Sequence, residues 1–140
     1  MSDGNATRVL VVEDNELDQE LLSRELRRTP FGDSTLFLSD PRRALELLTG
    51  DGAEDFRKNL VAIFLDVHLP YMSGLDVLRS LRELPPMDVP VIVITSAPSP
   101  ATVETCQTLG VQVFVEKPVR LAGFSKALAE LFHTPRPASA

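Results

Sequence analysis

Short apolar runs, separated by stretches with helical spacing, constrain the fold of this chain most. Five such runs cover residues 8–12, 35–39, 60–65, 91–94 and 111–115. The run at 60–65 shows no alternation of apolar and polar residues and ends at Asp66, as expected for a strand covered on both faces. The sequence therefore predicts five strands, several of them buried on both sides.

Leucines and other apolar residues recur at helical spacing between these runs. Helices are expected over 16–28, 41–48, 75–81, 103–109 and 121–131. Residues 50–58 are polar and are interpreted as a loop. The predicted domain spans 8–133, between a flexible N-terminus at 1–7 and a disordered tail at 134–140.

The alternation of strands and helices indicates the fold class. It implies right-handed crossovers, a parallel sheet and helices on both faces. The expected fold is a flavodoxin-like (βα)5 doubly wound sheet with the strand order 2-1-3-4-5. In this fold the ligand site lies beyond the carboxyl ends of the first and third strands. Residues that follow those two strands are therefore the first candidates for function.

The composition and charge of the chain narrow the classes of function. Its 140 residues suit a single domain, and a net charge of −6 disfavours binding to nucleic acid or to anionic membranes. No apolar run approaches the roughly 18 residues of a membrane span. The N-terminus lacks a secretory pattern and Cys106 is the only cysteine, so a cytoplasmic protein with a protein or small-ligand partner is expected.

Three carboxylates are expected to meet at the predicted ligand site. Glu13 and Asp14 follow the first run, and Asp66 follows the third. Two unit charges about 5 Å apart repel by about 3 kcal/mol at an effective dielectric of about 20, so a cation is needed to offset the repulsion. Mg²⁺ fits because it prefers oxygen ligands and keeps positions for phosphate. Each residue alone is more simply a solvated loop position, but the set favours a metal site.

Two further residues follow the fourth and fifth strands and complete the predicted site. Thr95 ends the fourth apolar run, and Lys117 comes after the fifth. A phosphoryl group on Asp66 would meet the Lys117 ammonium and the Thr95 hydroxyl, which stabilise its oxygens. Asp66 is the expected nucleophile, since an ionised carboxylate needs no general base. Taken singly, Lys117 is as readily a surface lysine and Thr95 a helix cap.

Four motifs occur in order along the chain. They are Val11-Val12-Glu13-Asp14-Asn15, Leu65-Asp66-Val67-His68-Leu69-Pro70-Tyr71-Met72-Ser73-Gly74, Ile94-Thr95-Ser96 and Glu116-Lys117-Pro118. In residue type and spacing these motifs resemble the response regulator receiver domain of two-component signalling, over nearly the whole predicted domain. The resemblance implies that Asp66 is phosphorylated with the help of Mg²⁺. The implied ligands of the metal are the carboxylates of Glu13, Asp14 and Asp66 and the backbone carbonyl of His68.

The resemblance also implies how the phosphoryl group is sensed. Thr95 and Lys117 are implied to contact it, and Phe114 is implied to change rotamer as Thr95 moves inward. The peptide between Lys117 and Pro118 is implied to be cis, which proline tolerates. Phe114 lacks the hydroxyl of a tyrosine, so only burial of its ring can act as a switch, and an ordinary core role is equally open.

The implied function is that of a stand-alone receiver and not of an enzyme with a separate substrate. A sensor histidine kinase or a histidine phosphotransfer protein would phosphorylate it, and its own chemistry would be self-phosphorylation and autodephosphorylation. No output domain is expected after Phe132. The signal is therefore expected to leave through the fourth helix, fifth strand and fifth helix, toward a downstream protein or a second copy. Asp18, together with Glu13-Asp14-Asn15, also resembles bacterial regulators paired with phytochrome kinases.

Three other classes of protein remain open. A haloacid-dehalogenase-like phosphatase also uses a strand-end aspartate with Mg²⁺, but it typically needs a second aspartate where this chain has His68. A flavin carrier would need a phosphate-binding loop after the first strand, where Glu13 and Asp14 repel phosphate. An interaction module that is never phosphorylated would share the fold without the chemistry, although the complete set of site residues argues against it.

Overall fold

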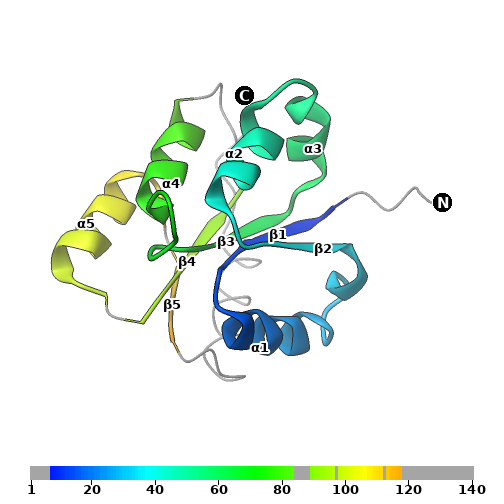
Figure 1. Ribbon diagram of the computed structural model, residues 1–140, viewed down its shortest axis with the longest axis horizontal. Coiled ribbons are helices and arrows are strands. Elements are labelled where there is room, and N and C mark those ends of the chain that lie inside the picture. Colours follow the sequence, from blue (N-terminus) through cyan, green and yellow to red (C-terminus); the bar gives the residue numbers. More distant parts are fainter. Residues whose placement is uncertain (1–6, 84–88, 97, 112, 118–140) are drawn as a thin grey trace.

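The computed structural model describes residues 7–83, 89–96, 98–111 and 113–117, which form a layered α/β fold (Figure 1). Five strands lie parallel in the order β2-β1-β3-β4-β5. Their bounds are β1 Val9–Val12, β2 Thr35–Leu38, β3 Ala62–Asp66, β4 Val91–Thr95 and β5 Val113–Glu116. The predicted flavodoxin-like fold and its strand order are confirmed.

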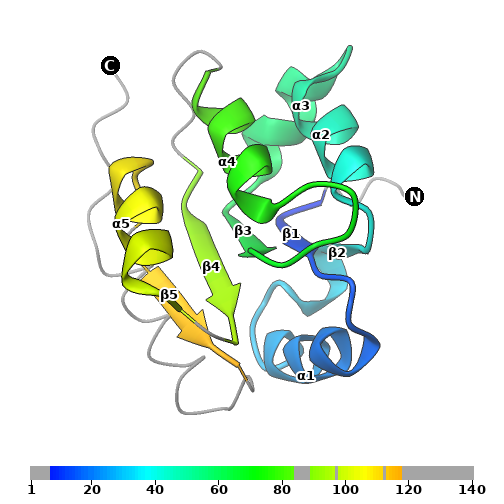
Figure 2. The same ribbon diagram turned by 60° about the vertical axis from the view of Figure 1, so that its left-hand side comes forward.

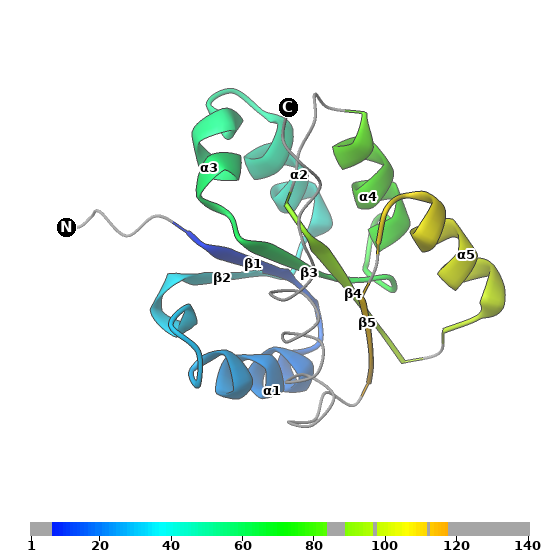
Figure 3. The ribbon, with the colours of Figure 1, turned by 180° about the vertical axis from the view of Figure 1, so that it is seen from behind.

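Helices cover both faces of this sheet (Figures 1 and 3). Their bounds are α1 Glu16–Leu26, α2 Pro41–Thr49, α3 Ala53–Asn59, α4 Gly74–Arg82 and α5 Pro100–Thr108, with a short 3-10 turn at Gly32–Ser34. α1 packs on one face, whereas α2, α4 and α5 pack on the other. Among the helices that the structure describes, none has the length and apolar character needed to span a membrane.

The segment at 50–58 is largely helical, so the prediction of a loop there was wrong. α3 begins after Gly52, whose φ of 77° lies in the left-handed region that glycine adopts without strain. Ala53 is buried and Phe56 packs partly against the core. Two apolar side chains in one short helix are too few to produce a recognisable helical period, which is why the sequence did not indicate it.

The additional helix shifts the numbering of the later ones. The helix predicted as the fourth in the chain is α5. The strands and the other described helices begin and end within a few residues of their predicted bounds. The helix expected at 121–131, the tail at 134–140 and the first six residues lie outside the described residues, and those expectations stay predictions.

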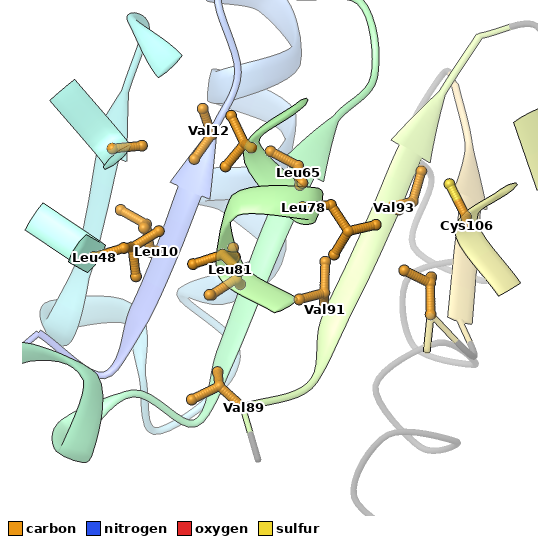
Figure 4. Close-up of a cluster of buried hydrophobic side chains, with 14 of the residues drawn as sticks. Leu10, Val12, Leu48, Leu65, Leu78, Leu81, Val89, Val91, Val93 and Cys106 are labelled. Atoms are coloured by element: carbon orange, nitrogen blue, oxygen red, sulfur yellow. The ribbon is translucent and has the colours of Figure 1, made fainter. Parts of the chain in front are cut away.

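The core has two layers, because each strand places alternate side chains on opposite faces of the sheet. On one face, strand side chains pack with Leu22 and Leu26 of α1. On the other, they pack with Leu48 of α2, Leu78 of α4 and Cys106 of α5 (Figure 4). β1, β3 and β4 are buried throughout, as predicted for strands covered on both faces. This packed interior fixes the positions of the residues that follow each strand.

Gly74 brings the start of α4 directly against the end of β3. Its N–H donates to the Val67 carbonyl oxygen at 2.9 Å. A Cβ atom at this position would overlap the carbonyl oxygen of Asp66 and lie 3.0 Å from the Val67 Cα. The close approach of α4 to Asp66 therefore requires glycine.

Replacing Gly74 with alanine is expected to lower the free energy of unfolding by about 3 kcal/mol, since backbone atoms must move to admit the new Cβ. Gly52→Ala is the control. Its Cβ would meet nothing within 4 Å, and only the positive φ opposes the change, at a cost of about 1 kcal/mol. Urea unfolding followed by circular dichroism measures both variants. Equal losses would show that the contact at Gly74 is not tight.

Candidate functional site

Three carboxylates meet at the carboxyl edge of the sheet. Glu13 and Asp14 follow β1, and Asp66 is the last residue of the adjacent strand β3. Each offers an oxygen atom, and these atoms lie within 4.8 Å of one another. Glu13 and Asp66 are buried, whereas Asp14 is exposed. The predicted convergence of these carboxylates is confirmed, and their role as metal ligands stays a prediction.

Backbone N–H groups orient the two buried carboxylates. The Asn15 N–H donates to Glu13 Oε2 at 3.1 Å, and the His68 N–H donates to Asp66 Oδ1 at 3.0 Å. The Gln19 side chain donates to the Glu13 carbonyl oxygen and so ties this loop to α1. The turns that follow β1 and β3 therefore set the directions of both side chains.

The Lys117 ammonium lies among carboxylates from three parts of the chain. Its Nζ is 2.8 Å from Glu13 Oε1, 2.8 Å from Asp18 Oδ2 and 2.9 Å from Asp66 Oδ2. Figure 2 shows the end of β5, which Lys117 follows directly, near α1, which carries Asp18. Burial acts to lower the pKa of Lys117, but its contacts with Asp18, Glu13 and Asp66 together outweigh burial and raise the pKa above its ordinary value. Lys117 therefore stays positively charged at this edge of the sheet.

Asp18 is a residue of this group that the sequence analysis did not place at the site. It lies in the first turn of α1, where its N–H donates to Asn15 Oδ1 at 2.9 Å and Asn15 caps the helix. Its side chain is only 13% exposed because it faces Lys117. The available signal is its spacing, since a residue four positions after Asp14 comes one turn into a helix that starts at the site.

Glu13 has the least favourable environment of these carboxylates. Burial and a side-chain hydrogen bond with Asp66 raise its pKa from 4.5 to about 7, although Lys117 and the Asn15 N–H act in the opposite direction. Its Oε1 is buried, and the residues that the structure describes give it no hydrogen bond of good geometry, despite the ammonium nearby. A carboxylate oxygen can accept from more than one partner, so a cation could contact this oxygen in addition to the ammonium.

The donor set fits a hard divalent cation. The group contains the carboxylates of Glu13, Asp14, Asp18 and Asp66 and the single ammonium of Lys117, so negative charge is in excess when all of them are ionised. The three clustered carboxylates offer only oxygen ligands, which ions such as Mg²⁺ prefer. Glu13, Asp14 and Asp66 are therefore the residues that could hold such an ion.

The other predicted site residues lie around this group. Thr95 ends β4 and is buried, and its carbonyl oxygen accepts a hydrogen bond from the Lys117 N–H at 2.9 Å. Phe114 lies on β5 opposite Val93 of β4 and packs against the core. A rotamer change of Phe114 stays a prediction, as does the cis peptide, because Pro118 lies outside the described residues.

An exposed tyrosine that the sequence analysis did not single out lies in the loop between β3 and α4. Tyr71 has a left-handed backbone, with a φ of 70°, and is 74% exposed. The Arg42 guanidinium carbon lies 3.8 Å from the centroid of its ring, and this guanidinium also pairs with Asp40 at 2.8 Å. This cation–π contact favours one position of the ring. The loop that follows Asp66 therefore presents an aromatic surface to solvent.

Residues 9–129 match the response regulator receiver domain family. The chain belongs to this family. The two-component response regulator ORR3 of Oryza sativa subsp. indica is 32% identical to the receiver over 119 residues, covering 84% of this chain and 85% of that protein. The sensory/regulatory protein RpfC of Xanthomonas campestris is 30% identical over 127 residues, which cover 89% of this chain and 16% of that protein. The receiver thus spans only a small part of that relative.

Solved structures agree with this assignment. The bacteriophytochrome response regulator RtBRR is similar to the receiver with a TM-score of 0.76 at 32% identity, covering 96% of this chain and 82% of that one. The two sequence relatives come from a bacterium and a plant, so they identify the family of this chain but not the kind of organism it comes from. Membership of the family places the receiver in two-component signalling. It disfavours the two alternatives of a phosphatase and a flavin carrier.

Binding of Mg²⁺ to the receiver is expected to strengthen as the pH rises from about 6 to about 8. Below pH 7 the Glu13 carboxyl keeps its proton, which the cation must displace, and above pH 7 it is already ionised. The dissociation constant should fall by up to about tenfold per pH unit below 7 and then level off. Isothermal titration calorimetry at each pH measures it.

Glu13→Gln is the matched control for this measurement, since an amide of similar shape does not titrate. Binding by this variant should be weaker and should lose the part of the pH dependence that Glu13 causes. A wild-type dissociation constant that does not change between pH 6 and pH 8 would contradict the raised pKa of Glu13.

Proposed function

We propose that this receiver accepts a phosphoryl group on Asp66 in a Mg²⁺-dependent reaction. The observation that carries the proposal is the setting of Asp66, a buried carboxylate with the Lys117 ammonium 2.9 Å from one oxygen and the His68 N–H 3.0 Å from the other. A carboxylate with only a structural role would gain nothing from the acidic residues beside it. Family membership supports a sensor histidine kinase or a histidine phosphotransfer protein as the donor.

The residues around Asp66 have distinct roles in this proposal. A carboxylate oxygen of Asp66 attacks phosphorus, and the bond from phosphorus to the donor nitrogen breaks, leaving its electron pair on the imidazole. The Lys117 ammonium and the Thr95 hydroxyl contact the phosphoryl oxygens and stabilise their charge. Mg²⁺, when bound, supplies further neutralisation of charge. Its proposed ligands are Glu13, Asp14, Asp66 and the backbone carbonyl of His68.

The signal is proposed to leave through the surface around β5 and α5. Thr95 would move toward the phosphoryl group, and the Phe114 ring, which packs beside β4, would follow it. The helix expected at 121–131 lies outside the described residues, and its place in this surface stays a prediction. A downstream protein or a second copy of the chain would bind there. Beyond accepting the phosphoryl group and releasing it to water, the receiver is proposed to have no catalytic activity.

The setting of the receiver in the cell belongs to the same proposal. Similarity to RtBRR supports a single-domain regulator of the phytochrome-associated kind. The net charge of −6 supports a protein partner over nucleic acid or an anionic membrane surface. The one cysteine, Cys106, is buried and free, which suits the reducing cytoplasm.

Incubation of the protein with acetyl phosphate and Mg²⁺ is expected to add one phosphoryl group, measured by intact mass spectrometry. The gain should be absent in Asp66→Asn, which lacks the nucleophile, and absent without Mg²⁺, which the crowded carboxylates require. Asp51→Asn is the matched control, because Asp51 is exposed in the loop between α2 and α3. It should be phosphorylated like the wild type.

A wild-type protein that binds Mg²⁺ yet gains no mass would contradict the proposal. It would identify the chain as an interaction module with a receiver fold that is never phosphorylated. A mass gain that persists in Asp66→Asn would show instead that another residue is the acceptor.

A further inference from the structure

We propose that Asp18 is a positioning residue that keeps the Lys117 ammonium at the site when a divalent cation is bound. The inference rests on the proposed function of Asp66 as phosphoacceptor. The three carboxylate partners of Lys117 differ in whether they could also hold the cation. Glu13 and Asp66 belong to the cluster of carboxylates that could hold the cation, and Asp18 does not.

A bound cation would change what two of these partners offer to Lys117. Once Glu13 and Asp66 coordinate a metal, much of their negative charge is neutralised, and the metal itself repels the ammonium. Lys117 has a flexible stem and its side chain is 14% exposed, so other positions of the ammonium are open to it when it is repelled. Asp18 Oδ2, 2.8 Å from Nζ, is then the carboxylate that still favours the inward position.

Asp18 is held firmly enough for this role. Its N–H donates to Asn15 Oδ1 in the cap of α1, and α1 packs against the sheet through Leu22 and Leu26. Figure 2 shows α1 lying beside the end of β5. A carboxylate on a fixed helical turn loses little freedom when it pairs with an ammonium, so the contact favours one position of Lys117.

The consequence for the reaction is that Lys117 stays where a phosphoryl oxygen arrives. A charged group already in place need not be recruited from solvent when transfer occurs. Asp18 itself would not touch the reacting atoms, and its effect on the rate would pass through Lys117.

Detection of lysine ammonium groups by ¹H–¹⁵N NMR tests the role of Asp18 independently of activity. The chain has three lysines, so the Lys117 signal can be assigned by its loss in Lys117→Arg. Without a cation, wild type and Asp18→Asn should both show this signal, because Glu13 and Asp66 hold the ammonium. With saturating Mg²⁺, wild type should keep the signal and Asp18→Asn should lose it.

Glu16→Gln is the matched control. Glu16 is exposed in the same first turn of α1, so this variant also removes one negative charge from the start of the helix. It should behave like the wild type with and without Mg²⁺. Survival of the Lys117 signal in Asp18→Asn with Mg²⁺, or its loss from wild type with Mg²⁺, would overturn the proposal.

The rate of phosphorylation by acetyl phosphate at saturating Mg²⁺ separates this inference from the proposed function. Asp18→Asn is expected to react about tenfold more slowly than wild type and Glu16→Gln, and to reach the same final mass. An unchanged rate would overturn the link from Asp18 to the reaction. If wild type is never phosphorylated, the proposed function fails, while the NMR measurement still decides whether Asp18 holds Lys117.

Discussion

The contact between the Lys117 ammonium and its carboxylate partners is the interaction on which the arrangement of this site depends. A parallel sheet places the carboxyl ends of its strands at one edge, so residues as distant in sequence as Asp66 and Lys117, 51 positions apart, become neighbours. The same geometry crowds negative charge, which must be offset for the chain to fold. One ammonium does this only in part, and Glu13, whose pKa is raised by burial and by its contact with Asp66, is the carboxylate most affected by this setting.

The framework that carries these charges is rigid, and the rigidity begins in the apolar strands. β1 and β3 are buried on both faces, so Glu13 and Asp66 start from fixed backbone positions. The N–H groups of the following turns then orient the carboxylates, and Gly74 allows α4 to close against the end of β3. Polar groups held in this way need little reorganisation when charge develops beside them.

The sequence predicted those parts of the structure that depend on patterns local to the chain. A strand buried on both faces appears as an unbroken apolar run, and this located β3 and Asp66. α3 was missed because only Ala53 and Phe56 give it an apolar side. The pairing of Asp18 with Lys117 depends on where the fold places α1 relative to the residue that follows β5. The left-handed backbone of Tyr71 is adopted by a residue type that rarely takes this conformation. The spacing of Asp18 from Asp14 indicates a place near the site but does not predict its partner, and Tyr71 has no signal in spacing.

The presence of Asp18 is difficult to explain by stability. It adds a fourth carboxylate to a group that already holds Glu13, Asp14 and Asp66 and only one ammonium. The dipole of α1 favours an acidic residue in its first turn, but Glu16 meets that preference from an exposed position, without desolvation. Helix electrostatics therefore account for the charge of Asp18 and not for its burial against Lys117. A role in holding Lys117 in place while Glu13 and Asp66 coordinate a metal accounts for both the charge and the burial of Asp18.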